Sequence, residues 1–203
     1  MSKQSTSKIF TEIYDKKIWG QGSGTGSRMS RNNKKYIDVL EELIKTYKIK
    51  SICDIGCGDW EFSHHINFSG IKYLGLDCVD SVIKANTKKY KKRNISFAVK
   101  SITASNIPKK FDMIILKDVI QHWTDKEIID IFAKILKENK YVFCTNGYKF
   151  MKDPKKNSLK KRDISNKYRY HPVDIDKPPF SKFKSKCIFR YNYFSKQMLL
   201  FKY

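Results

Sequence analysis

Residues 54–58 read Asp-Ile-Gly-Cys-Gly, an acid followed by two closely spaced glycines. They come after a short apolar run and before a segment that can begin a helix. Glycines at such a turn let the backbone bend sharply and approach a bound molecule closely. A second acid, Asp77, stands 23 residues after Asp54, at the end of the next apolar run. Because an acid at that place can accept hydrogen bonds from ribose hydroxyls, the two features predict a nucleoside site.

The residues after Gly58 narrow the kind of nucleoside. A dinucleotide needs the full G-x-G-x-x-G pattern, which seats its pyrophosphate on a helix N-terminus. Here Asp59 and Glu61 follow the glycines, and their negative charges would repel a pyrophosphate, which disfavours a dehydrogenase. Asp54, ahead of the glycines, suits a ligand that carries an amino group or a cation. These features favour S-adenosylmethionine, which has an ammonium, a sulfonium and no phosphate.

Apolar runs and amphipathic segments alternate between residues 31 and 146. Ser30 is placed to cap the helix expected from 31, Asp80 or Ser81 the helix that runs to about 92, and Thr124 begins a capping box before the last helix. This alternation predicts an α/β fold with a mainly parallel sheet and helices on both faces. Strands are expected at 51–55, 73–77, 95–99, 112–116 and 141–145. Helices are expected at 31–48, 60–66, about 80–92 and from 124. Residues 187–194 and 197–203 are expected to form a C-terminal antiparallel hairpin.

The sequence resembles a known family at these positions. Residues 54–58 resemble the first motif of class I S-adenosylmethionine-dependent methyltransferases, and Asp77 matches their ribose-binding acid. Residues 111–122 resemble their fourth strand and the loop that faces the substrate. The resemblance covers about residues 31–146, and the closing hairpin fits the sixth and seventh strands of that fold. It implies a single Rossmann-like methyltransferase domain.

A narrower resemblance concerns three segments of the chain. They are Ile-Trp-Gly at 18–20 with the Ser/Gly run after it, the loop 118–122, and the ending 174–180. Together they resemble small methyltransferases associated with sugar and glycan modification. The resemblance therefore implies a small-molecule or glycan acceptor, with a sugar hydroxyl as the favoured group.

Two departures from the family pattern concern the cofactor. Trp60 stands where many relatives have a third glycine, and Ser101 stands near the place of an acid that touches the adenine amine. Adenine contact is then expected from Ser101 and Ile102. The cofactor-binding residues implied by the resemblance and its surroundings are Asp54, Gly56, Cys57, Gly58, Asp77, Cys78, Ser101, Ile102, Lys117 and Trp19.

Methyl transfer is an in-line displacement at carbon, so the enzyme chiefly aligns the acceptor with the methyl–sulfur bond. A hydroxyl acceptor must also lose a proton, which makes a nearby base useful. His122 is the candidate base, because it follows the predicted fourth strand and histidine titrates near neutral pH. The alternative is that His122 orients its loop or packs beside Trp123. Asp118 is the second catalytic candidate, as a residue that orients the substrate or His122, or else caps a turn.

The ends of the chain differ in composition from its middle. Residues 1–30 contain a glycine-rich run at 20–26 and are expected to form a lid over the cofactor, with Tyr14 and Trp19 near the pocket; a plain linker is the alternative. Residues 31–203 are expected to form the methyltransferase domain, with 149–184 as an irregular insertion on the substrate side. Five cysteines without a pair of CxxC motifs predict reduced thiols and no metal site.

The net charge of +22 has two interpretations. It can mark an RNA partner, which makes an RNA methyltransferase the first alternative and a non-catalytic basic binding module the second. However, only six of the 42 basic residues are arginine, the residue most used for bidentate phosphate recognition, and AT-rich coding also enriches lysine. Residues 1–6 lead into no apolar signal core, and no apolar run reaches the roughly 18 residues of a membrane helix. A cytoplasmic protein without membrane contact is therefore expected.

Overall fold

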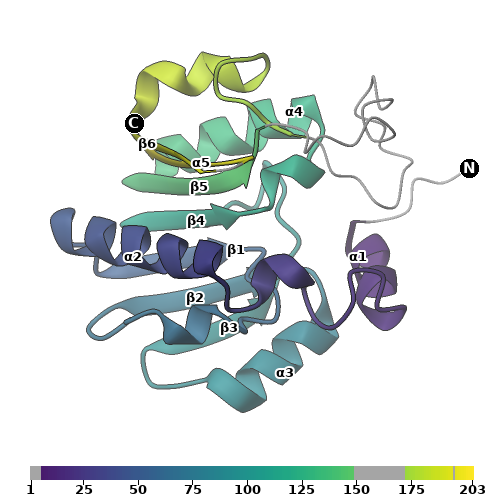
Figure 1. Ribbon diagram of the computed structural model, residues 1–203. Coiled ribbons are helices and arrows are strands. Elements are labelled where there is room, and N and C mark those ends of the chain that lie inside the picture. Colours follow the sequence, from purple (N-terminus) through teal and green to yellow (C-terminus); the bar gives the residue numbers. More distant parts are fainter. Residues whose placement is uncertain (1–5, 149–171, 194) are drawn as a thin grey trace, which may run out of the picture. The chain divides into compact units, whose positions relative to one another are not determined.

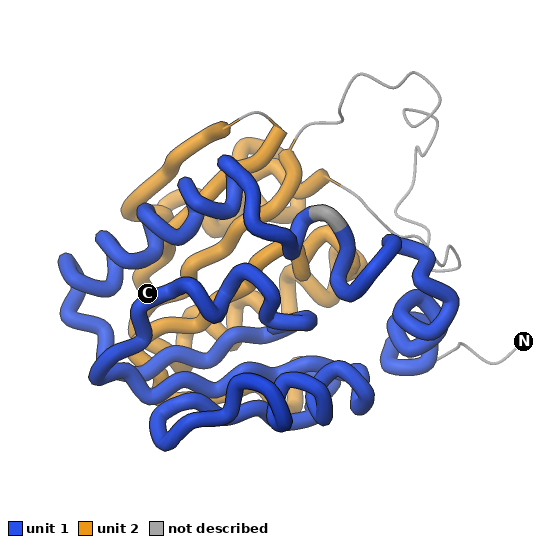
Figure 2. Tube along the Cα trace, turned by 60° about the horizontal axis from the view of Figure 1, so that its bottom comes forward, with its two compact units in different colours: residues 1–102 blue, residues 103–203 orange. Residues whose placement is uncertain are grey.

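The computed structural model of the chain describes residues 6–148, 172–193 and 195–203 (Figure 1). Backbone contacts divide the chain into two compact units, Met1–Ile102 and Thr103–Tyr203 (Figure 2). Among the described residues, the first unit contains three strands and the second contains four.

Parallel pairing joins the three strands of the first unit. They are β1 (Ser51–Ile55), β2 (Lys72–Asp77) and β3 (Ile95–Val99), in the order β3-β2-β1. Four of the five residues of β1 are buried, as expected of a strand covered on both faces. Ile55 is paired with Leu76, so β1 and β2 end at the same edge. Ligands of open α/β sheets bind at such an edge.

The α-helices in the described part of the first unit are α1 (Thr6–Asp15), α2 (Arg31–Thr46) and α3 (Asp80–Tyr90). The predicted cap of α2 is confirmed, because the side chain of Ser30 accepts a hydrogen bond from the backbone of Asn33 at 3.2 Å. The predicted cap of α3 is wrong. Val79 occupies the N-cap, and Asp80 lies in the first turn, where its charge is favourable near the helix N-terminus.

The helix predicted at 60–66 is reduced to a 3-10 turn at Ser63–His65. The reason lies at Trp60, whose φ of 58° is in the left-handed region. Its indole is 3% exposed and packs among aromatic rings with centroids 5.1 to 5.9 Å away. Burial of a large aromatic side chain offsets the strain of that backbone conformation. The rings around Trp60 belong to Phe68, Tyr73, Tyr90 and Phe97.

The second unit combines parallel and antiparallel pairing. Its strands are β4 (Met113–Lys117), β5 (Tyr141–Gly147), β6 (Cys187–Tyr193) and β7 (Lys196–Lys202), in the order β4-β5-β7-β6. β4 and β5 are parallel, whereas β7 runs antiparallel to both β5 and β6. The predicted C-terminal hairpin is therefore confirmed. Strand β4 begins one residue later than the sequence predicts.

The helical residues 125–138 and the 3-10 segment Phe180–Lys186 pack against each other in the second unit. Thr124 forms the predicted capping box with Glu127, and the stretch continues through α4 (Asp125–Glu127), a π-helical turn (Ile128–Phe132) and α5 (Ala133–Glu138). The ring of Phe132 lies 4.9 to 5.1 Å from three other phenylalanine rings. Two of these belong to the 3-10 segment Phe180–Lys186. The end of the predicted insertion thus packs into the apolar core of its unit, whereas residues 149–171 lie outside the described residues.

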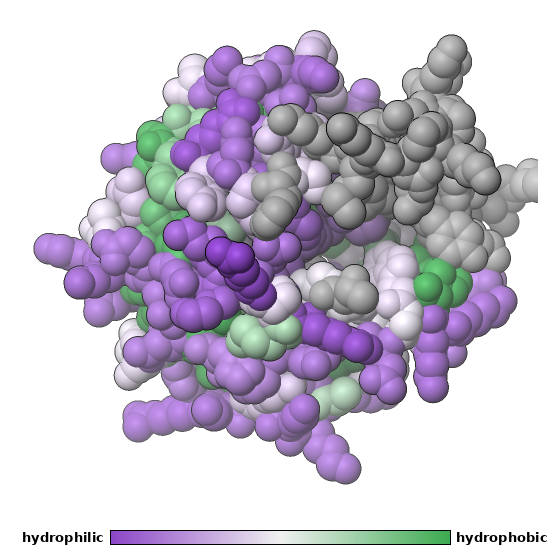
Figure 3. Space-filling view, viewed as in Figure 1, coloured by the Kyte–Doolittle hydropathy of each residue, from purple (hydrophilic) through white to green (hydrophobic). Residues whose placement is uncertain are grey.

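The fold class predicted from the sequence is confirmed: the described residues form an α/β fold with seven strands, mainly parallel, and a C-terminal antiparallel hairpin. Among the described residues, no helix combines the length and the apolar character needed to cross a bilayer. Hydrophilic side chains cover most of the described surface in the view of Figure 3.

Candidate functional site

Asp77 is the last residue of β2 and is only 9% exposed. Its Oδ2 accepts a hydrogen bond from the backbone N–H of Gly58 at 3.1 Å, and its Oδ1 accepts one from Val79 at 3.0 Å. Burial raises the pKa of this carboxyl, and the backbone donors partly oppose the rise. The predicted acid and the predicted glycine turn are thus brought into direct contact.

The glycine turn has the backbone that only glycine adopts easily. Gly56 has a φ of 73° and Gly58 a φ of 58°. The N–H groups of Gly56 and Cys57 both donate to the carbonyl of Leu76, at 2.7 and 3.0 Å, which fixes the turn to the end of β2. A Cβ on Gly58 would collide with the Oγ of Ser23. Burial also raises the pKa of the Cys57 thiol well above its usual value, so this cysteine is no nucleophile at neutral pH.

Asp54 lies at the end of a buried chain of side-chain hydrogen bonds. The Trp60 indole donates to the Tyr73 hydroxyl at 2.8 Å, and Tyr73 donates to Oδ2 of Asp54 at 2.7 Å. This chain fixes the orientation of the carboxylate at the end of β1. The residue that departs from the family pattern, Trp60, therefore supports a predicted cofactor residue.

The N-terminal segment lies against the glycine turn. Ser23 donates its backbone N–H to Oδ2 of Asp59 at 2.7 Å, and Asp59 donates its N–H to the Oγ of Ser23 at 2.8 Å. The hydroxyl of Tyr14 lies 2.6 Å from the same Oγ. A Cβ on Gly22 would collide with the carboxylate of Asp59. We call this reciprocal pair of bonds the Ser23–Asp59 clasp.

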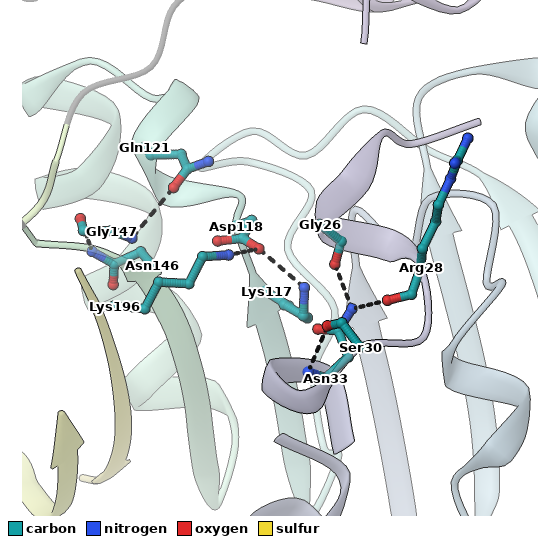
Figure 4. A network of polar contacts seen from close by, with 10 residues as sticks. All are labelled: Gly26, Arg28, Ser30, Asn33, Lys117, Asp118, Gln121, Asn146, Gly147 and Lys196. Carbon is teal, nitrogen blue, oxygen red and sulfur yellow. Dashed lines mark hydrogen bonds and ion pairs between the residues drawn. The ribbon is translucent and has the colours of Figure 1, made fainter. Parts of the chain in front are cut away.

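Further contacts hold the two ends of the N-terminal segment. Ser7 in α1 donates to the carbonyl of Cys78, next to Asp77, at 2.7 Å. The amide of Asn33 donates to the carbonyls of Gly26 and Arg28, both at 2.7 Å (Figure 4). The glycine-rich run is therefore tied to the ends of the strands on one side and to α2 on the other.

The remaining cofactor candidates of the first unit lie near the ends of its strands. Trp19 is half-buried, and its ring packs edge-on against Phe10 and Tyr14 at 5.8 and 6.4 Å. Ser101 and Ile102 follow β3, with Ser101 exposed and Ile102 half-buried. The neighbouring Lys100 donates its N–H to the carbonyl of Asp77 at 2.7 Å, which holds this connection beside β2.

The candidates of the second unit gather at the end of β4. Oδ2 of Asp118 lies 3.0 Å from the Lys117 ammonium and 2.6 Å from the Lys196 ammonium (Figure 4). Burial would raise the pKa of Asp118, but the charges of Lys117 and Lys196 outweigh it and hold this pKa far below its usual range. Asp118 has a φ of 58° and donates its N–H to the carbonyl of Thr145 at 2.7 Å. Lys117, predicted for the cofactor, is thus an ion-pair partner of Asp118.

His122 closes the 3-10 turn Ile120–His122 and is half-buried. Its N–H donates to the carbonyl of Val119 at 2.9 Å. The buried Gln121 accepts a long hydrogen bond from the N–H of Gly147 at 3.5 Å, which joins the turn to the end of β5. Sequence reasoning did not single out Ser23, Asp59 and Lys196 as site residues.

Comparison with known proteins gives one family and several similar structures. The family model described as a methyltransferase domain matches residues 47–188. A ubiquinone biosynthesis O-methyltransferase of Pelagibacter ubique is 31% identical over 130 residues, which are 56% of this chain and 52% of the relative. The chain therefore spans about half the length of this curated relative.

Solved structures resemble the chain at low sequence identity. Magnesium protoporphyrin IX methyltransferase from Synechocystis PCC 6803 with bound SAH has a TM-score of 0.61, 13% identity, and coverage of 95% of this chain and 97% of its own. An O-methyltransferase family protein from Burkholderia thailandensis has a TM-score of 0.63, 13% identity, and coverage of 85% and 56%. At such identity the likeness concerns the fold.

Proposed function

Because the chain belongs to the methyltransferase domain family, we propose that it transfers the methyl group of S-adenosylmethionine to a hydroxyl group of a small molecule. The predicted enzyme class and cofactor are confirmed at the level of the family. The observation that carries the proposal is the hydrogen bond from Gly58 to Asp77, because it unites the two predicted parts of a nucleoside site.

The described residues fit the chemistry of the cofactor. Asp77 offers two carboxylate oxygens to ribose hydroxyls, and Asp54 offers a fixed negative charge to the ammonium. Bound there, the cofactor supplies an electrophilic methyl group on a sulfonium. The Ser23–Asp59 clasp supports a role of residues 1–30 in covering the site. Further residues proposed to contact the cofactor are Gly56, Cys57, Gly58, Cys78, Ser101, Ile102, Lys117 and Trp19.

His122 remains our candidate for the base. Asp118 and His122 are the two catalytic candidates. Lys117 and Lys196 hold the pKa of the Asp118 carboxyl far below its usual range. A carboxylate of that kind is a poor proton acceptor at neutral pH, whereas an imidazole titrates there. We therefore assign proton removal to His122 and a positioning role to Asp118.

The acceptor is proposed from chemistry and from the names of relatives. One relative is named as a ubiquinone biosynthesis O-methyltransferase, and one structural neighbour as a magnesium protoporphyrin IX methyltransferase. Ubiquinone and magnesium protoporphyrin IX are both small molecules. A sugar or glycan hydroxyl is the finer proposal, supported by the resemblance of residues 18–20, 118–122 and 174–180. The net charge of +22 favours RNA as the second candidate acceptor.

The test is methyl transfer from S-adenosylmethionine labelled in its methyl group. The acceptors are catechol, methyl α-D-glucopyranoside and a short unstructured RNA. We expect label in a hydroxylated small molecule, and His122→Gln should lower kcat about 100-fold, within the usual contribution of general base catalysis. The exposed His65 provides the control, because His65→Gln should leave kcat unchanged. Label in RNA alone would contradict the proposal.

A further inference from the structure

Three side chains of the second unit contain buried polar atoms without a hydrogen-bond partner among the described residues. They are Oδ1 of Asp118, Oγ1 of Thr145 and both amide atoms of Gln197. Buried polar atoms in folded proteins are nearly always paired, because an unpaired one keeps the cost of losing water. Unpaired atoms next to a candidate active-site loop therefore point to a ligand that pairs them.

Strand register separates these atoms into two groups. Lys117 is paired with Thr145, and Gly147 is paired with Lys196. Paired residues and residues two apart lie on the same face of a sheet, so Lys117, Thr145 and Lys196 share one face. Both lysines bind Asp118, which brings its carboxylate to this face. Gln197 follows Lys196 directly and therefore points to the opposite face.

The two oxygens of the Asp118 carboxylate have different surroundings. Both lysine ammonium groups reach Oδ2, and neither dashed line in Figure 4 ends on Oδ1. An ionised carboxylate only accepts hydrogen bonds, so Oδ1 requires a donor. Two positive charges beside one negative charge repel an ammonium donor but admit a neutral hydroxyl. The hydroxyl of Thr145 can donate or accept a hydrogen bond, so it can donate to the oxygen of the same ligand hydroxyl that donates to Asp118.

Tyr193 adds a further polar group on this face, because it is paired with Lys196. Burial, and then the negative charge of Asp118, raises the pKa of its phenol. Tyr193 therefore stays protonated at neutral pH and offers no competing negative charge. The C-terminal hairpin, formed by β6 and β7, supplies both Tyr193 and Lys196.

We propose that Oδ1 of Asp118 and Oγ1 of Thr145 form an anchoring site for a hydroxyl group of the methyl acceptor, with Lys196 of the hairpin fixing the carboxylate. This inference rests on the proposed function and adds the acceptor side to it. The ligand class is a neutral or anionic hydroxylated small molecule. A cationic amine does not fit the site.

The test titrates the full chain, saturated with S-adenosylhomocysteine, with two hydroxylated probes, catechol and methyl α-D-glucopyranoside. Each probe is compared with its fully O-methylated form, which has the same skeleton and no hydroxyl donor. Thr145→Val removes only a hydroxyl that has no partner among the described residues, so it should weaken probe binding about tenfold without lowering the melting temperature. Lys196→Met should weaken it similarly. Lys202→Met, at the exposed end of the same strand, is the control.

The outcomes separate the two proposals. Tighter binding of a hydroxylated probe than of its O-methylated form, weakened by Thr145→Val and not by Lys202→Met, supports the anchoring site. The inference is overturned if S-adenosylhomocysteine binds normally while neither probe binds, the paired probes bind equally, or Thr145→Val leaves their dissociation constants unchanged. Failure of the wild-type chain to bind S-adenosylhomocysteine would instead overturn the proposed function.

Discussion

Asp77 and Asp118 both stand at the carboxyl ends of strands, but Asp77 is held by backbone groups and Asp118 by charged side chains. Asp77, at the end of β2, accepts hydrogen bonds from the backbone of Gly58 and Val79. Asp118, directly after β4, accepts hydrogen bonds from the side chains of Lys117 and Lys196. Burial raises the pKa of Asp77, whereas the two lysines lower that of Asp118 despite its burial.

The difference shows how the partners of one residue type decide its role. Among the described residues, backbone amides of Gly58 and Val79 hold Asp77, and no ion pair is recorded for it, which suits the ribose-binding role proposed for this carboxylate. Two ammonium groups keep Asp118 ionised and direct one of its oxygens, so it can orient a ligand but is a poor base. Neither role follows from the aspartate itself.

The largest expected effect comes from crowding the glycine turn beside Asp77. Gly58→Ala places a Cβ against the Oγ of Ser23 at a positive φ. We expect an affinity for S-adenosylhomocysteine at least about 100-fold weaker, since a displaced turn loses several hydrogen bonds at once. Gly70 is the matched control, because it also has a positive φ but nothing within 4 Å of its Cβ position. Equal losses in Gly58→Ala and Gly70→Ala would show that backbone strain alone is responsible.

A smaller effect is expected from opening the Ser23–Asp59 clasp. Ser23→Ala removes the hydroxyl that accepts from Asp59 and contacts Tyr14. We expect affinity for S-adenosylhomocysteine to fall about tenfold, the scale of one or two hydrogen bonds, as measured by calorimetry. Ser27→Ala, in the adjoining 3-10 turn, should change nothing. An unchanged affinity in Ser23→Ala would favour the alternative that residues 1–30 are a plain linker and do not cover the cofactor.

Two threonines of the second unit should respond in opposite ways. The hydroxyl of Thr124 caps a helix, so Thr124→Val should cost about 1 kcal/mol of the free energy of unfolding and leave acceptor binding intact. The hydroxyl of Thr145 is buried without a partner among the described residues, so Thr145→Val should cost no stability. Urea titrations measure both. A large loss of stability in Thr145→Val would mean that its hydroxyl serves the fold.

The smallest effect is a pair of opposite slopes with pH. A raised pKa means that the folded state binds more protons, so the stability of wild type relative to Asp77→Asn should rise as the pH falls through that pKa. A lowered pKa gives the opposite pH dependence, so the stability advantage of wild type over Asp118→Asn should be at its maximum at neutral pH. It should be lost as the pH falls below the usual carboxyl pKa of about 4. Slopes of the same sign in urea titrations across this range would contradict the comparison.

Local signals made parts of both units predictable. The strand before Gly56, the glycine turn and the acid at the end of β2 follow each other within a short stretch, and the positive φ of Gly56 and Gly58 favours glycine at the turn. The cap of α2 by Ser30 and the capping box at Thr124 are local in the same sense. Such features are fixed by neighbours in the sequence, and the structure confirms them.

Contacts between distant residues account for what the sequence did not reveal. Lys196 lies 78 positions from Asp118 and is one of many lysines, so no pattern distinguishes it. Ser23 lies 36 positions from Asp59, within a low-complexity run. Trp60 shows the converse, because the short helix predicted at 60–66 gives way to the packing of the Trp60 indole among other rings. Tertiary packing overrides a local preference there.

We propose that Asp77 and the glycine turn form the cofactor site. Calorimetric titration with S-adenosylhomocysteine of the wild-type chain, Asp77→Asn and Asp80→Asn tests it most directly. Asp80 is the control, because it is an exposed acid three residues away, paired only with Lys84 among the described contacts. We expect binding by wild type and Asp80→Asn, and a loss of about 10- to 100-fold in Asp77→Asn, the scale of hydrogen bonds to a charged group. Unchanged affinity in a folded Asp77→Asn protein would contradict the assignment of Asp77 and the glycine turn to the cofactor site.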